Sequence, residues 1–110
     1  MALQVAGQLI PTTREGFLRD RRQWNHAVAT ALAAAHGTQL SPAHWEILEL
    51  LRDYCAKGHP PPAMRTLAAE IRQHLGADKS RSLYLMRLFG PSPAKMAARL
   101  AGLPRPKNCL

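Results

Sequence analysis

The sequence predicts a mainly α-helical domain of the α+β class, with a small N-terminal β-hairpin, about five helices, a helix-turn-helix-like core and an extended C-terminal arm. Three observations lead to this prediction. Two short apolar segments flank a turn near the N-terminus, apolar residues recur at helical spacing along most of the chain, and alternate prolines occur close to its end. The 110 residues are enough for one domain with a modest core. We expect the domain at residues 1–102 and a flexible arm that carries Cys109 at 103–110.

The hairpin is expected at about residues 2–18, because apolar residues lie on both sides of Ala6-Gly7, a plausible tight turn. A first helix should then run from a cap at Asp20 to His36. Its apolar face would consist of Trp24, Val28, Ala31, Leu32 and Ala35.

Four further helices are marked by caps and breakers. Ser41 should cap the second helix, with Pro42 in its first turn and Gly58 after its end. Three consecutive prolines, 60–62, cannot lie inside a helix and form a stiff connector. The third helix should begin near Met64 and stop at Gly76, the fourth should span 79–89, and the fifth should begin at Ser92-Pro93 and end at Gly102.

The arm is predicted from Pro104 and Pro106, which disfavour a helix and favour an extended chain. At the polyproline rise of ~3.1 Å per residue, Cys109 would lie roughly 19 Å beyond Leu103. An arm of this length can enter the cleft of a partner.

The charge balance is strongly basic: 15 Lys and Arg against 7 Asp and Glu give a net charge of +8. Such a surface attracts polyanions and acidic protein surfaces alike, and charge alone leaves both open. There is no apolar run of ~18 residues for a membrane span and no basic-then-apolar N-terminal signal. A cytoplasmic protein with no membrane contact is therefore expected.

Cys109 is the residue most suited to carry chemistry. The thiolate is the reactive form of cysteine, and Arg105 and Lys107 favour it, whereas the α-carboxylate of Leu110 opposes them. An inert thiol on a frayed tail is the alternative. Cys55 falls on an apolar helix face and is expected to be a small buried hydrophobe.

No metal site or cofactor is expected. The histidines lack the spacing of a zinc site, and the chain has neither a phosphate-binding glycine loop nor a nucleophile elbow. His44, at the start of a helix, is expected to pack or cap. The histidines are His26, His36, His44, His59 and His74.

Residues 63–89 allow a second interpretation, because two short helices joined by Gly76-Ala77-Asp78 resemble a helix-turn-helix. A solvated basic face on an ordinary helix pair is the alternative. The residues that would contact nucleic acid or a partner are Arg65, Arg72, Lys79, Arg81 and Arg87.

Near the end of the chain, Ala101-Gly102-Leu103-Pro104-Arg105-Pro106 is followed by Cys109 and one apolar residue. This segment is similar to the C-terminal segment of the DsrC/TusE sulfur carriers. Other segments of the family occur in its order, and the resemblance covers nearly the whole chain. They include Glu15-Gly16-Phe17-Leu18, Trp24-Asn25, Leu40-Ser41-Pro42, His44-Trp45-Glu46, Arg52-Asp53-Tyr54 and Pro93-Ala94-Lys95.

Two departures refine the resemblance. DsrC proteins carry a second arm cysteine, and Ala98 fills the aligned position here, so the chain resembles the single-cysteine, TusE-like branch. Gly90-Pro91-Ser92 also differs from the usual family pattern before Pro93.

The resemblance implies a sulfurtransferase that carries sulfur as a Cys109 persulfide, without a cofactor. It implies a TusBCD/DsrEFH-like donor complex and a tRNA thiouridylase that makes wobble 2-thiouridine, so that tRNA is reached only indirectly. Pro104, Arg105, Pro106 and Lys107 would dock the arm in these partners. Two alternatives remain: a DsrC-like carrier in dissimilatory sulfur metabolism, and a helix-turn-helix regulator that binds DNA.

Overall fold

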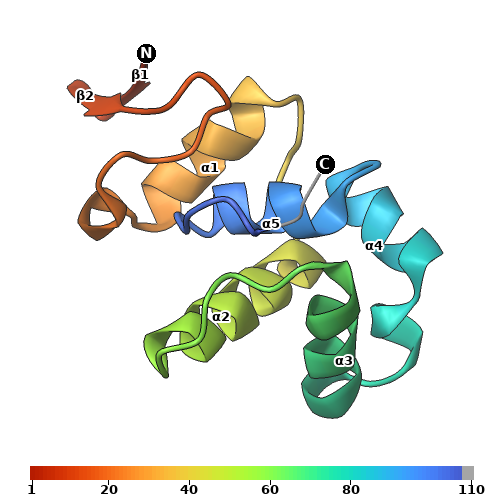
Figure 1. The fold of residues 1–110 in the computed structure, drawn as a ribbon. Helices are drawn as coiled ribbons and strands as arrows, with labels where there is room; N and C mark the ends of the chain where they lie inside the picture. The colour runs from red at the N-terminus through yellow and green to blue at the C-terminus, as the bar shows by residue number, and fades with distance from the viewer. Residues whose placement is uncertain (108–110) are drawn as a thin grey trace.

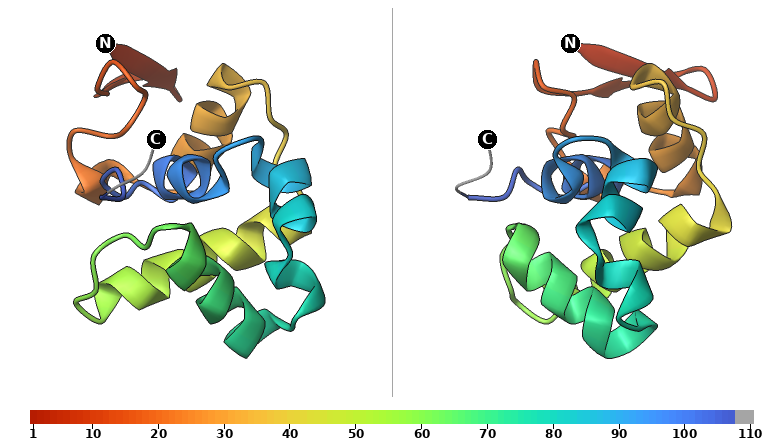
Figure 2. Two further views of the ribbon diagram at one scale, coloured as in Figure 1. Left: turned by 45° about the vertical axis from the view of Figure 1, so that its right-hand side comes forward. Right: turned by 90° about the vertical axis from the view of Figure 1, so that its right-hand side faces the viewer.

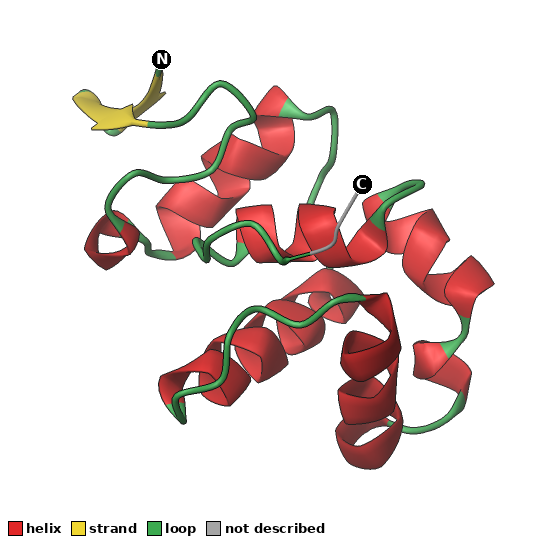
Figure 3. Ribbon diagram, viewed as in Figure 1, coloured by secondary structure: helices red, strands yellow, loops and turns green. Residues whose placement is uncertain are grey.

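The computed structural model describes residues 1–107 and confirms a mainly helical domain with one N-terminal hairpin (Figures 1 and 3). Two strands, five α-helices and two single 3-10 turns make up its elements. In chain order they are β1 Ala2–Val5, β2 Gln8–Pro11, η1 Arg21–Gln23, α1 His26–Ala35, α2 Pro42–Ala56, α3 Met64–Leu75, η2 Asp78–Ser80, α4 Ser82–Phe89 and α5 Pro93–Leu100.

Helix α5 lies at the centre of the domain and contacts the other four α-helices. The hairpin and α1 lie on one side of it, and α2 and α3 lie on the other (Figures 1 and 2). Its buried positions include Ala94, Ala97 and Ala98, whose small side chains let neighbouring helices approach closely, and the larger Leu100. The arm follows directly from this helix, so its root is set in the middle of the fold.

The hairpin forms around the predicted Ala6-Gly7 turn, but its strands end at Pro11, short of the expected residue 18. Leu3 pairs with Ile10 and Val5 with Gln8 in an antiparallel ladder. The two turn residues have positive φ, 51° at Ala6 and 78° at Gly7, as a two-residue turn with the twist of the flanking strands requires. Ile10 is buried and anchors the hairpin to the core.

The start of the first helix differs from the prediction. Asp20 caps only the short turn η1, where its Oδ1 accepts from Arg22 N, and α1 begins after Asn25, whose Oδ1 accepts from Val28 N at 2.9 Å. Trp24 therefore precedes α1 and does not belong to its apolar face. Within α1 the expected Ala31 and Ala35 are not in the core; the buried residues are Val28, Ala29, Leu32 and Ala33.

His44 caps and packs, as predicted. Ser41 N donates to its Nδ1 at 3.0 Å, so its Nε2 carries the proton and donates to Leu88 O at 2.8 Å. His44 is 6% exposed, and its ring meets Phe89 edge-on. This one side chain fixes the start of α2 and joins α2 to α4.

The helix pair α3–α4 is interrupted between its helices. The expected fourth helix begins as the 3-10 turn η2, the chain is extended at Arg81, and α4 starts at Ser82. Leu67 and Ile71 of α3 are buried, as are Leu85 and Phe89 of α4.

None of the helices within residues 1–107 has the length and apolar character that a membrane span needs.

Candidate functional site

The predicted catalytic residue, Cys109, lies outside the described residues, so the site is built from the root of the arm at 102–107. Leu103 is 5% exposed and belongs to the core, and Pro106 is also buried. Pro104, Arg105 and Lys107 are exposed. The described part of the arm thus lies on the domain, with two apolar residues inward and its charges outward.

Gly102 makes the turn from α5 into the arm. Its φ is +72°, in the left-handed region that glycine adopts without strain. A Cβ on this residue would lie 2.4 Å from Trp24 Cδ1, so only glycine fits against the indole. The turn is closed by Leu103 N, which donates to Ala98 O at 3.0 Å.

Trp24 and Arg52 hold the end of α5 from the outside. Trp24 Nε1 donates to Leu100 O at 2.9 Å, and Arg52 Nη1 donates to Ala101 O at 2.8 Å. The Arg52 guanidinium also lies over the indole, 3.9 Å from its centroid. Both side chains satisfy carbonyl groups that the end of a helix leaves without intrahelical partners.

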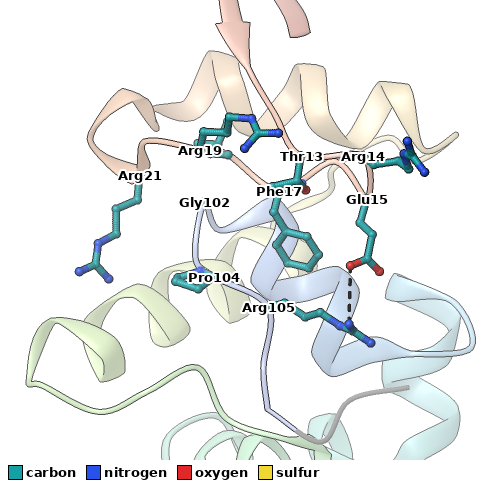
Figure 4. Close-up of a pocket in the computed structure, with 10 residues that line it drawn as sticks. Thr13, Arg14, Glu15, Phe17, Arg19, Arg21, Gly102, Pro104 and Arg105 are labelled. Carbon is teal, nitrogen blue, oxygen red and sulfur yellow. Dashed lines mark hydrogen bonds and ion pairs between the residues drawn. The ribbon is translucent and has the colours of Figure 1, made fainter. Parts of the chain in front are cut away.

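A second anchor comes from the turn at Thr13–Phe17. Thr13 N donates to Phe17 O at 2.7 Å, and Phe17 N donates to Thr13 Oγ1 at 3.1 Å, which closes the loop on itself. This loop presents Glu15, whose carboxylate pairs with Lys95 at 2.7 Å and with Arg105 at 3.7 Å. Figure 4 shows the pair with Arg105. The hydrogen bond from Lys95, aided by the charge of Arg105, lowers the pKa of Glu15.

Behind this loop lies an unusual buried cation. Arg99 is 8% exposed, and its guanidinium lies 4.9 Å from the centroid of the buried Phe17 ring. Burial and the charge of Arg99 both lower the pKa of the neighbouring His36, so this imidazole is neutral at pH 7. Gly16 lies against it, since an added Cβ would be 2.9 Å from His36 Cε1.

Cys55 faces the arm root but is not activated. It lines two shallow hollows with Arg21 and Leu103, and it is half-buried. Burial raises the pKa of the Cys55 thiol, and the charges of Arg21 and Arg52 only partly offset that rise. The thiol is therefore protonated at neutral pH, as expected of a packing residue.

The five basic residues of the helix-turn-helix interpretation lie away from the arm root, and none lines the hollows that the structure describes there. Lys79 is tied to Glu46 of α2 at 2.6 Å, and Arg81 lies 3.8 Å from Asp78. Arg65, Arg72 and Arg87 are exposed on α3 and α4.

Among residues 1–107, no group of three or more metal-ligating side chains comes together.

Sequence reasoning missed the residues that anchor the arm. Trp24 was expected on a helix face, and Arg52 had no assigned role, although both occur in segments that carry the family resemblance. Glu15 and Lys95 likewise had no assigned role, although both occur in segments that carry the family resemblance. That resemblance was the available signal, since no local pattern connects Trp24 with a carbonyl 76 positions away.

These features define a small helical domain that holds a C-terminal arm by its root. The family model described as DsrC like protein matches residues 4–110, and the chain belongs to this family. It is 41% identical over 108 residues to the sulfurtransferase TusE homolog of Haemophilus influenzae, covering 98% of this chain and 99% of that one. It is 39% identical over 104 residues to the sulfurtransferase TusE of Escherichia coli K12, covering 94% and 95%.

Solved structures agree with this assignment. The solution structure of DsrC from Allochromatium vinosum matches over all of both chains, with 37% identity and a TM-score of 0.89. The crystal structure of the oxidized γ-subunit of dissimilatory sulfite reductase (DsrC) from Archaeoglobus fulgidus matches equally fully, with 34% identity and a TM-score of 0.86. The fold predicted from sequence is therefore the fold of this family.

Proposed function

We propose that this protein is a sulfur carrier of a sulfur relay, a sulfurtransferase that holds sulfur as a persulfide on Cys109. One observation carries the proposal: curated relatives about 40% identical over nearly the whole chain are named sulfurtransferase TusE. The position of Cys109, at the end of an arm with an anchored root, supports the assignment of the sulfur to this residue.

The chemistry is a transfer of one sulfur atom between cysteines. The Cys109 thiolate attacks the outer sulfur of a donor persulfide, a new S–S bond forms on Cys109, and the donor cysteine leaves as a thiolate. In the next step an acceptor cysteine attacks the outer sulfur and releases the Cys109 thiolate. No external oxidant is needed, and because the partners supply the rest of each site, the carrier needs no acid–base residues of its own.

The proposed partners are a TusBCD/DsrEFH-like donor complex and a tRNA thiouridylase that places the sulfur in wobble 2-thiouridine. Pro104, Arg105, Pro106 and Lys107 would dock the arm in these proteins. The exposure of Pro104 and Lys107 supports this role, because a partner can reach these side chains. Arg105 is exposed as well, and in the free protein it pairs with Glu15. Prolines also limit the conformations of the arm and so reduce the entropy lost on docking.

The first experiment is intact-mass analysis after incubation with a small persulfide donor. The protein should gain the mass of one sulfur atom, Cys109→Ser should prevent the gain, and Cys55→Ser should not. Cys55 is the matched control because burial raises its pKa. Mapping of the added sulfur to Cys55 would show the assignment of the arm cysteine to be wrong.

A carrier for dissimilatory sulfur metabolism is the second candidate, favoured by the full-length match to DsrC structures. Ala98 speaks against it, because it stands where DsrC proteins carry their second arm cysteine and is 1% exposed in the core. Deletion of the gene should abolish 2-thiouridine in digests of total tRNA. An unchanged 2-thiouridine content would favour the second candidate.

A further inference from the structure

A hollow of about 540 Å³ lies beside the root of the arm, between the chain leading into η1 and the first arm residues (Figure 4). Its apolar lining includes Phe17, Leu18 and Pro104. Its rim carries Arg14, Arg19 and Arg21, all three of them exposed. None of these arginines belongs to the segments in which sequence reasoning expected partner contacts.

The rim is positive because its cations are not matched by acids. The carboxylate of Glu15, the only acidic group in this lining, is already engaged by Lys95 and Arg105. Among residues 1–107, no carboxylate lies within ion-pair distance of the three rim arginines, whereas the adjacent Arg22 is paired with Asp20 at 3.1 Å.

The arginines do not converge on one point. Arg14 and Arg21 extend away from each other on opposite sides of the hollow, and Arg19 lies between them (Figure 4). Arg19 is also held in place, since its Nε donates to Thr12 O at 3.1 Å. Side chains spread in this way fit an extended acidic surface better than a single small anion.

We propose that Arg14, Arg19 and Arg21 form a basic collar that docks on an acidic rim around the entrance of the protein with which the arm exchanges sulfur. The inference rests on the proposed function: whatever protein admits the arm must come up against the residues around its root. An acidic protein surface fits better than RNA, because stacking of bases would need exposed aromatic rings. Phe17 is 4% exposed, with Arg99 over its ring.

The test measures association of the full chain with the purified TusBCD-type donor complex of the same genome. Reversing the collar, by Arg14→Glu, Arg19→Glu and Arg21→Glu together, should slow association about ten-fold or more at low salt, because complementary charges steer encounter. The difference should shrink at high salt. Since Arg19 also bonds Thr12, the double variant Arg14→Glu, Arg21→Glu serves if the triple variant unfolds, as judged by circular dichroism.

A matched control reverses three exposed arginines on α3 and α4: Arg65, Arg72 and Arg87. It changes the net charge by the same amount. Equal slowing by this control would overturn the collar, since long-range charge alone would explain the effect. The collar would also be overturned if the collar variant associated with the donor complex as fast as the unmodified chain. The same holds if the variant lost only its binding to bulk tRNA.

A second readout separates this inference from the proposed function. Loading of Cys109 by a small persulfide donor should be the same in the collar variant and in the unmodified chain, because no docking is involved. If the unmodified chain is not loaded at all, the proposed function fails. If loading is normal and the collar variant associates as fast as the unmodified chain, only the collar fails.

Discussion

Replacing Gly102 by alanine should destabilise the domain by about 2–4 kcal/mol, as the sum of two separable effects. A side chain at the observed φ of +72° costs about 1 kcal/mol in the left-handed region. The new Cβ would also lie 2.4 Å from Trp24 Cδ1. Trp24 cannot easily retreat, because it donates to Leu100 O and is covered by Arg52, so overpacking adds about 1–3 kcal/mol.

Gly37→Ala is a closely matched control. Gly37 has nearly the same φ, +74°, but a Cβ there would meet no atom within 4 Å. Its replacement should cost only the backbone contribution of about 1 kcal/mol. Urea unfolding of both variants gives the two free energies of unfolding, and their difference is the cost of the contact with Trp24. Equal losses would show that the indole moves aside, and the account of a rigid arm root would be refuted.

Three other perturbations test the packing of the domain, at the arm root and elsewhere in the core. Arg52→Leu should cost about 1–3 kcal/mol in urea unfolding, because a carbonyl at the end of α5 loses its donor, whereas Arg65→Leu on the surface should cost little. Burial lowers the pKa of His36 below its ordinary 6.5, so the unfolded chain binds the proton more readily and stability falls as the pH drops below about 6.5. Thermal unfolding across this pH range should show the fall, and His36→Gln should reduce it. Leu85→Ala, at a fully buried site, should cost about 2–5 kcal/mol, against less than about 0.5 kcal/mol for the exposed Leu83→Ala.

Helix positions could be predicted where local chemistry decides them. Ser41-Pro42 begins α2, Gly76 ends α3 and Pro93 opens α5, all by capping and proline effects that act within a few residues. The start of α1 was misplaced for the same kind of reason. Asp20 and Asn25 are both good caps, and sequence alone gives no means of knowing that the first serves only a short 3-10 turn.

In the candidate site, too, features set by local sequence could be predicted and features set by tertiary contacts could not. The arm and its cysteine are visible in sequence because prolines and a terminal thiol are local features. The anchors are not, because Trp24 and Arg52 meet the end of α5 only after the chain has folded. Arg99 is a further case: an arginine on an amphipathic helix is normally solvated, and only the tertiary position of Phe17 explains its burial.

The anchored root changes how far the arm can deliver its cysteine. Measured from Leu103, an extended chain would place Cys109 roughly 19 Å away. Pro106 is buried on the domain, however, and three extended residues beyond it span at most about 11 Å. The proposed sulfur exchange at Cys109 therefore requires either that the partner comes close to the arm root or that Pro106 leaves the domain surface. The proposed basic collar around this root would serve the first of these, because it would draw an acidic entrance to the one place from which a short arm can reach inside.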